Sequence, residues 1–195
     1  MSKKIEFYFD FASPTAFLAF KRLQQLQEKY SADIEYKGVL LGGVFKSTGN
    51  TSPILLAPKG RYMAVDLPRF AKRYQVEMNF NPYFPLNTLP LMRGYYAAKE
   101  LSMEMEYLKM VFDGMWVGKV DFSKPEALVK VVKDLNINAE EFQALVSSDS
   151  IKDQLKDTTG ELVKRGGYGV PTMYLGKDMF FGQDRLDFVE EALAE

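Results

Sequence analysis

The sequence contains no cysteine and no histidine. Without cysteine, the chain can form neither a disulfide nor a cysteine-bound metal site. Without histidine, catalytic pairs of serine or cysteine with histidine are excluded, and the usual zinc and iron sites, which depend on these two residue types, are nearly excluded. Any thiol that takes part in the chemistry of this protein must therefore come from a ligand.

An excess of charge of either sign is also absent. The 195 residues include 25 Lys and Arg and 26 Asp and Glu, for a net charge of −1, which gives no reason to expect nucleic acid or a membrane surface as a partner. With no apolar signal segment and no run long enough to span a bilayer, the sequence predicts a cytoplasmic protein. Hydrophobic residues make up 47% of the chain, enough for the core of one domain, or of one domain with a large insertion.

The first third of the chain has the pattern of a βαβ unit. Residues 4–10 are rich in aromatic side chains and bounded by charge, which is typical of a strand, and residues 33–41 predict a second strand. Between them, residues 14–30 carry apolar side chains at helical spacing. Two strands joined by a helix in this way are expected to be parallel, with a right-handed crossover.

The middle of the chain is helical and its end returns to β structure. Residues 42–60 are rich in Gly, Ser, Thr and Pro and predict a loop. Two short apolar segments around Gly176 predict a hairpin, and residues 183–195 a closing helix. Between these regions, helical periodicity predicts helices over 61–75, 89–110, 124–135, 138–147 and 149–165. Pro68 is expected to kink or split the first of them.

Neither end of the chain has enough strands for a stable sheet of its own. We therefore expect residues 1–45 and 165–195 to share one sheet in a single discontinuous α/β domain. Residues 46–164 then form an all-helical insertion that closes over one end of that sheet, with its Met and Phe residues mostly in the core.

Ser13 stands directly before Pro14 at the expected start of the first helix, where it is a natural N-cap. The N-terminus of a helix exposes unpaired N–H groups and a partial positive charge, both of which stabilise a bound anion. A hydroxyl group at this place can also donate a hydrogen bond to a thiolate, and such settings lower the pKa of a thiol. Two interpretations stay open: Ser13 only caps the helix, or it also holds a ligand anion.

Two further motifs near the C-terminus are candidates for ligand binding. Pro171, after Val170, enters a predicted edge strand, either as an ordinary edge proline or with a cis bond that leaves the Val170 backbone free to pair with an extended ligand. Gln183 and Asp184 follow Gly182 at the start of the closing helix. Asp184 can hold an α-amino group beside N–H groups that hold a carboxylate, or it can be a plain helix cap.

The predicted loop of the middle region offers two more candidates. Asn50 and Lys59 lie in a stretch otherwise short of charge, where Lys59 either binds a ligand carboxylate or is simply solvated. Trp116 is the single tryptophan and either lines an aromatic pocket or packs in the core.

Taken together, these motifs resemble the 2-hydroxychromene-2-carboxylate isomerase family and, more broadly, the kappa-class glutathione transferases and DsbA-like oxidoreductases. The resemblance covers essentially the whole chain and implies a thioredoxin-like fold with a large helical insertion. It rests on the order and spacing of "FYFDFASPTAFLA", "GNTSP" followed by "PKG", "NTLPLMRG", "VFDGMWVG", and "GVPTMYLG" followed by "FFGQDRL".

The resemblance also implies roles for individual residues. DsbA-like oxidoreductases carry Cys-x-x-Cys at the helix mouth, whereas these positions here are Ser13 and Ala16, so disulfide exchange, which needs a protein thiolate, is excluded. In the isomerase and kappa-class families, the serine at this place faces the sulfur of bound glutathione. Ser13 would therefore stabilise that thiolate, while other contacts to the tripeptide would come from Val170, the presumed cis-Pro171, Gln183, Asp184, Asn50 and Lys59.

The activity implied is a glutathione-dependent isomerisation between 2-hydroxychromene-2-carboxylate and trans-o-hydroxybenzylidenepyruvate-type substrates, with glutathione as a recycled cofactor and a small aromatic carboxylate as substrate. The thiolate adds reversibly to a conjugated carbon, and the acceptor pocket is expected between the sheet and the helical insertion. Two alternatives stay open: a kappa-like transferase that conjugates glutathione to small electrophiles, and a non-catalytic thioredoxin-fold binding module. A homodimer is also left open, since the family often forms dimers.

Overall fold

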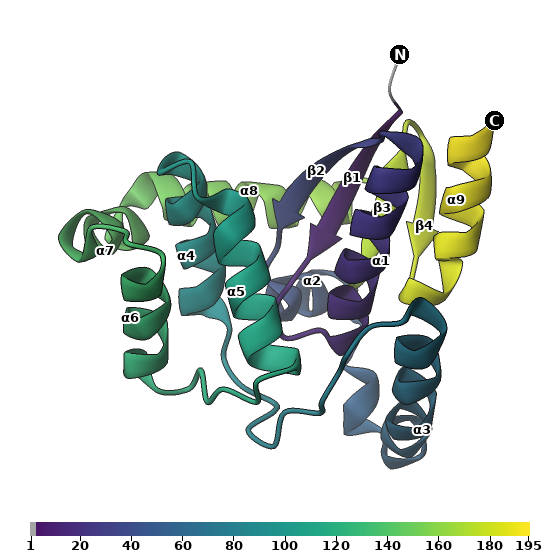
Figure 1. Cartoon of the computed structure of the whole chain (residues 1–195), viewed down its shortest axis with the longest axis horizontal. Coiled ribbons are helices and arrows are strands. Elements are labelled where there is room, and N and C mark those ends of the chain that lie inside the picture. Colours follow the sequence, from purple (N-terminus) through teal and green to yellow (C-terminus); the bar gives the residue numbers. More distant parts are fainter. Residues whose placement is uncertain (1–2) are drawn as a thin grey trace.

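The protein is built around one four-stranded sheet with the order β2–β1–β3–β4, seen in a computed structural model that describes residues 3–195 (Figure 1). β1 (Lys4–Phe9) runs parallel to β2 (Asp33–Gly38) and antiparallel to β3 (Thr172–Leu175). β3 in turn pairs antiparallel with β4 (Asp178–Phe181). The prediction that the two ends of the chain share one sheet is confirmed.

The first crossover helix has the predicted bounds. α1 (Pro14–Tyr30) begins with Ser13 as its N-cap and ends before Ser31, whose φ is 50°. Its apolar face is buried against the sheet, and the helix also contacts α3, α5 and α9. In Figure 1, α1 lies in front of the sheet, whereas α8 passes behind β1 and β2. The two faces of the sheet are therefore both covered.

The segment predicted as a loop over 42–60 is largely helical, so that prediction is wrong. It contains α2 (Leu41–Thr48), a short 3₁₀ turn η1 (Pro53–Leu55) and the start of α3 (Ala57–Tyr74). α3 also continues through Pro68 without a break. The glycines and hydroxyl residues of α2 have low helix propensity, but contacts from distant elements hold its first turn. The Leu40 N–H donates to Thr159 Oγ1, and the Leu41 N–H donates to Asp10 Oδ2.

The long helix predicted over 89–110 is in fact two helices. α4 (Leu89–Glu100) ends at a turn in which Ser102 has a φ of 59°, and α5 (Glu104–Trp116) follows. The remaining elements are close to the predicted ranges. They are α6 (Pro125–Asp134), α7 (Ala139–Ser147), α8 (Asp149–Lys164), a 3₁₀ turn η2 (Gln183–Arg185) and α9 (Leu186–Ala194).

An aromatic cluster forms the centre of the core. Phe9, Phe11, Phe20 and Phe112 are fully buried, and the Phe112 ring centroid lies 4.8 Å from that of Phe11 and 5.0 Å from that of Phe20. Such pairs add to the stabilisation that comes from burying large apolar side chains. Trp116 belongs to this core, because it is fully buried and its Nε1–H donates to the Phe11 carbonyl at 2.9 Å.

The helices are not spread evenly around the sheet. α4 to α7 gather on one side of the sheet in Figure 1, and α3 lies at its lower end, where β1 ends and α1 begins. The division into 1–45 with 165–195 and an insertion over 46–164 stays a prediction. Within residues 3–195, no helix is both long and apolar enough to cross a membrane.

Candidate active site

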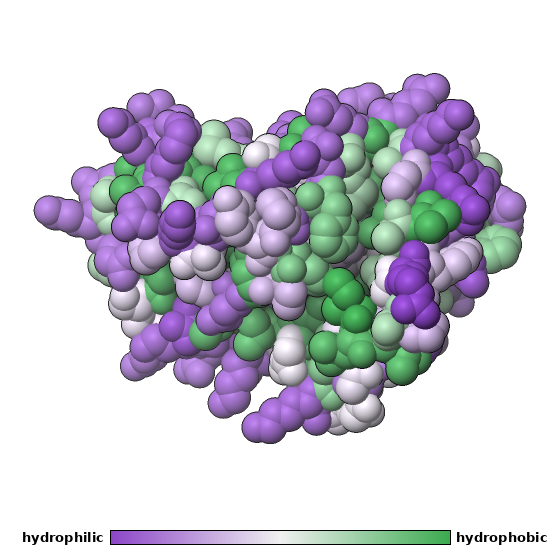
Figure 2. All heavy atoms as spheres, turned by 90° about the horizontal axis from the view of Figure 1, so that it is seen from below, coloured by the Kyte–Doolittle hydropathy of each residue, from purple (hydrophilic) through white to green (hydrophobic). Residues whose placement is uncertain are grey.

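A cavity of about 990 Å³ opens where β1 ends and α1 begins. Its other walls come from α2, from the 50–64 segment, from the loop before α4, and from the turns on either side of β3 and β4. Figure 2 views the molecule from this lower end and shows a hollow surrounded by hydrophobic residues. All the residues singled out from the sequence as ligand contacts line this one cavity, namely Ser13, Asn50, Lys59, Val170, Pro171, Gln183 and Asp184.

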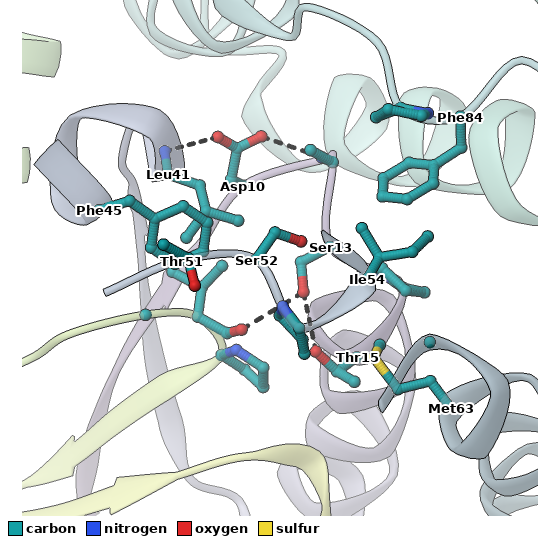
Figure 3. A pocket seen from close by; sticks show the side chains of 18 of the residues that line it. Asp10, Ser13, Thr15, Leu41, Phe45, Thr51, Ser52, Ile54, Met63 and Phe84 are labelled. Carbon is teal, nitrogen blue, oxygen red and sulfur yellow. Dashed lines mark hydrogen bonds between the residues drawn. The ribbon is translucent and has the colours of Figure 1, made fainter. Parts of the chain in front are cut away.

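Ser13 acts as a helix cap and also faces the cavity. Its Oγ accepts a hydrogen bond from the Ala16 N–H at 3.1 Å, which satisfies one of the unpaired donors of the first turn. The same oxygen lies 2.8 Å from Thr15 Oγ1 and 3.3 Å from the Val170 carbonyl, to which it donates (Figure 3). The side chain is buried, yet a cap uses only a lone pair of the hydroxyl group. Capping and anion binding are therefore compatible at this residue.

The Val170–Pro171 segment lies beside Ser13 in the cavity wall. The peptide bond between the two residues is cis, and Pro171 directly precedes β3. β3 pairs with β1 on one side and β4 on the other, so the prediction of an edge strand is wrong. The Pro171 carbonyl accepts a hydrogen bond from the Gly182 N–H at 2.9 Å. This bond joins the two C-terminal motifs of the cavity wall.

Gln183 and Asp184 lie in the turn η2, which precedes α9, and Asp184 makes no cap of that helix. Gly182 before them has a φ of 104°, and a Cβ there would collide with Asp184 Oδ1. Glycine is therefore required at this position. Gln183 is buried, and its carbonyl accepts from the Tyr74 hydroxyl at 2.6 Å, which ties η2 to α3. The exposed Asp184 carboxylate is 2.8 Å from Arg185 Nη1.

Asn50 and Lys59 form the outer rim of the cavity. Asn50 Nδ2 donates to the Tyr168 carbonyl at 2.8 Å, which links the end of α2 to the segment before β3. Lys59 was predicted to lie in a loop, but it lies in the first turn of α3. Of the described residues that line the cavity, Lys59 is the one with a basic side chain. An anionic ligand group that binds at this rim can therefore interact with the Lys59 ammonium group.

Asp10 is a residue of the site that sequence reasoning missed. Its carboxylate is buried at the end of β1 and accepts from the Ala12 N–H at 2.9 Å, the Leu41 N–H at 2.8 Å and the Thr88 hydroxyl at 2.7 Å. Burial raises the pKa of Asp10 against the lowering effect of these hydrogen bonds. The sequence signal that could have identified Asp10 is an acidic residue at the end of a strand of aromatic residues. The carboxylate fastens α2 and the segment before α4 to the loop that carries Ser13.

Most of the remaining cavity wall is apolar, and these apolar residues were also missed. Leu41, Phe45, Ile54, Met63 and Phe84 point into the cavity from α2, η1, α3 and the loop before α4 (Figure 3). The Met and Phe residues of the middle region were expected to be mostly core, and Met63 and Phe84 are exceptions in that they also line the cavity. The cavity thus has two parts, a polar part around Ser13 and an apolar part that suits an aromatic or aliphatic ligand.

The comparisons with known proteins agree with this geometry. The DsbA-like thioredoxin domain family matches residues 4–194. A 2-hydroxychromene-2-carboxylate isomerase from Pseudomonas sp. (strain C18) is 32% identical over 193 residues, which cover 97% of this chain and 89% of that protein. The chain belongs to the 2-hydroxychromene-2-carboxylate isomerase family.

Other members of the wider DsbA-like group match over similar lengths. The solved structure of a 2-hydroxychromene-2-carboxylate isomerase superposes with a TM-score of 0.89 and 29% identity, and covers 98% of this chain and 94% of its own. Glutathione S-transferase kappa 1 from Homo sapiens is 26% identical over 213 residues, which cover 100% of this chain and 92% of that protein. The resemblance predicted from the motifs and the thioredoxin-like fold are confirmed, and the isomerase family is a family of enzymes.

Proposed function

We propose that this protein is a glutathione-dependent isomerase that interconverts 2-hydroxychromene-2-carboxylate and trans-o-hydroxybenzylidenepyruvate-type substrates. One observation carries the proposal. In a chain without cysteine or histidine, the Ser13 hydroxyl stands at the N-terminus of α1 and faces a cavity large enough for two ligands. The cavity is therefore suited to a thiolate that the protein does not contain.

The polar part of the cavity would hold glutathione. The Ser13 hydroxyl donates to the sulfur, and the helix N-terminus favours the negative charge of the thiolate. The Val170 main chain pairs with the cysteinyl unit, and Pro171 completes that wall. The exposed Asp184 carboxylate holds the α-amino group together with the neighbouring Gln183.

At the rim, Lys59 holds one of the two carboxylates of the tripeptide as a point charge, and Asn50 contributes an amide beside it. The support for these roles is that the side chains line one cavity with complementary charges. The thiolate, the α-amino group and one carboxylate of glutathione then each have a partner of opposite sign or a donor.

The apolar part would hold the aromatic acceptor. The closed hydroxychromene first opens: its ring C–O bond breaks, the hemiketal hydroxyl proton passes to the released phenolic oxygen, and a conjugated ketone forms. The thiolate then forms a C–S bond to the conjugated carbon, while the electron pair of the double bond moves toward the ketone oxygen. The former double bond is now single and rotates. The electron pair then returns, the C–S bond breaks, and the isomer leaves with the glutathione thiolate restored. The protein stabilises the thiolate and positions both molecules, so it needs neither a nucleophile nor an imidazole of its own.

A kappa-like transferase is the second candidate, favoured by the match to the human kappa-class enzyme over the whole chain. It uses the same thiolate but leaves glutathione attached to the electrophile. A role in the degradation of aromatic compounds and a homodimer are parts of the proposal that rest on the resemblance to the isomerase family, and a cytoplasmic location is a part that rests on the sequence.

Calorimetry with glutathione, followed by a count of free thiol before and after turnover, tests the function. An isomerase binds glutathione and leaves the amount of free thiol unchanged, whereas a transferase consumes one thiol for each product. S-methylglutathione, which cannot form a thiolate, is the matched control and should support no isomerisation. A protein that binds no glutathione, or that isomerises the substrate without it, contradicts the proposal.

A further inference from the structure

We propose that Thr15 is a positioning residue that directs the hydrogen of the Ser13 hydroxyl toward the bound thiolate. The inference rests on the proposed function, because it concerns how the same site holds the sulfur. It starts from one contact that capping does not explain, the 2.8 Å separation of Ser13 Oγ and Thr15 Oγ1 (Figure 3). Thr15 lines the cavity in the first turn of α1.

The hydrogen bonds around Ser13 Oγ can be counted. A hydroxyl group has one hydrogen to donate and two lone pairs that accept. The Ala16 N–H occupies one lone pair at 3.1 Å. The hydrogen has two partners in the structure, the Val170 carbonyl at 3.3 Å and Thr15 Oγ1 at 2.8 Å, and the contact with Thr15 allows either hydroxyl to donate.

Only one assignment leaves the Ser13 hydrogen free for sulfur. If Ser13 donates to Thr15, the short contact uses the single hydrogen and a thiolate meets only an oxygen lone pair. If Thr15 donates to Ser13, both lone pairs of Ser13 are filled and its hydrogen makes the long bond to the Val170 carbonyl. That bond is the weaker of the two by length, so the hydrogen can turn to an arriving thiolate at small cost. Thr15, Ser13 and the sulfur then form a chain in which each hydrogen bond strengthens the next.

Thr15→Val tests the inference, because valine keeps the shape of threonine and removes the hydroxyl group. The pKa of the bound glutathione thiol, read from thiolate absorbance against pH, should rise by roughly 0.5–1 unit. The kcat should fall roughly three- to tenfold at a fixed pH, while KM for the acceptor stays unchanged. Thr15→Ser retains the hydroxyl group and should restore the wild-type thiol pKa.

The double variant Ser13→Ala/Thr15→Val separates an indirect from a direct role. If Thr15 acts through Ser13, the valine substitution has no further effect on the thiol pKa once Ser13 is alanine. An equal effect in both backgrounds means that Thr15 touches the sulfur itself and overturns the inference. So does a wild-type thiol pKa in Thr15→Val.

The same titration distinguishes a failure of this inference from a failure of the proposed function. If the wild-type protein binds glutathione with a lowered thiol pKa and Thr15→Val leaves that pKa unchanged, only the role of Thr15 is refuted. If the wild-type protein binds no glutathione, both proposals are refuted. Circular dichroism and the thermal midpoint of each variant establish that it is folded.

Discussion

Replacement of Ser13 separates the two roles that the structure gives to its hydroxyl group. Ser13→Ala removes the acceptor for the Ala16 N–H and also the donor proposed for the thiolate. Loss of an N-cap costs about 0.5–2 kcal/mol of stability. Loss of a hydrogen bond to a charged group costs about 1.5–3 kcal/mol, which corresponds to roughly one to two units in the pKa of the bound thiol.

Ser13→Gly is the matched control because glycine is tolerated as an N-cap and has no hydroxyl group. Replacing an N-cap serine by glycine costs only a few tenths of a kcal/mol, whereas replacing it by alanine costs more. Glycine also places no charge beside the Val170 carbonyl, which lies 3.3 Å from the Ser13 oxygen. We therefore expect near wild-type stability with a thiol pKa as high as in Ser13→Ala.

Two measurements on the three proteins test this reasoning. Denaturant unfolding gives the stability, and thiolate absorbance against pH gives the pKa of bound glutathione. The expected pattern is a loss of stability in Ser13→Ala alone and a raised thiol pKa in both variants. A wild-type thiol pKa in Ser13→Gly would refute the assignment of Ser13 to the sulfur, even if the activity of that variant were low for another reason.

Three further predictions concern other residues. Lys59→Met should weaken glutathione binding roughly two- to fivefold, with a smaller difference at high salt because the side chain is exposed; calorimetry at two ionic strengths measures this. Gly182→Ala should destabilise the protein by about 1–3 kcal/mol because of its φ of 104°, whereas Gly42→Ala, in α2 with open space around it, should be neutral or stabilising by up to about 1 kcal/mol in the same unfolding assay. The Arg165 guanidinium lowers the pKa of Glu6 to about 2, below its ordinary 4.5, so this carboxylate stabilises the fold above about pH 4.5 and the contribution is lost as pH falls toward 2. The free energy of unfolding of Glu6→Gln should therefore lie below that of the wild type by at most about 3 kcal/mol at pH 7, and a difference that does not shrink on acidification would contradict the ion-pair explanation.

Secondary structure is predicted most reliably from the sequence where the contacts that determine it are local. α1 has the predicted bounds because Ser13, Pro14 and the apolar spacing all act within one helix. α2 was missed because its first N–H groups bond to Asp10 and Thr159, which lie 31 and 119 residues away along the chain. No local signal in a Gly-Gly-rich segment reports such partners.

The candidate site shows the same division between local and distant information. The motifs around Ser13 and Pro171 were predicted to meet, and they lie together, because a resemblance over the whole chain carries long-range information. Met63 and Phe84 are apolar residues in helical or turn patterns, and the sequence does not distinguish an apolar side chain that faces a cavity from one that faces the core. The order of strands, which places β3 between β1 and β4, is likewise not encoded in the pattern of β3 itself.

The polar part of the cavity is assembled from segments that are distant in sequence. Because the chain has no cysteine for disulfides or metal sites, hydrogen bonds between these segments hold the polar part in place. Asp10 fixes the loop before Ser13 to α2 and to the segment before α4, while Asn50 fixes the end of α2 to the segment before β3. All of these bonds except the one from the Ala12 N–H join segments that are distant in sequence, so the positions of the Ser13 hydroxyl and the Val170 carbonyl depend on one shared network. A buried carboxylate that loses its hydrogen-bond partners is costly, so the three bonds to Asp10 favour this arrangement of the helix mouth. A preformed arrangement suits a thiolate site, because a donor that must first be ordered would spend part of its hydrogen-bond energy on its own positioning.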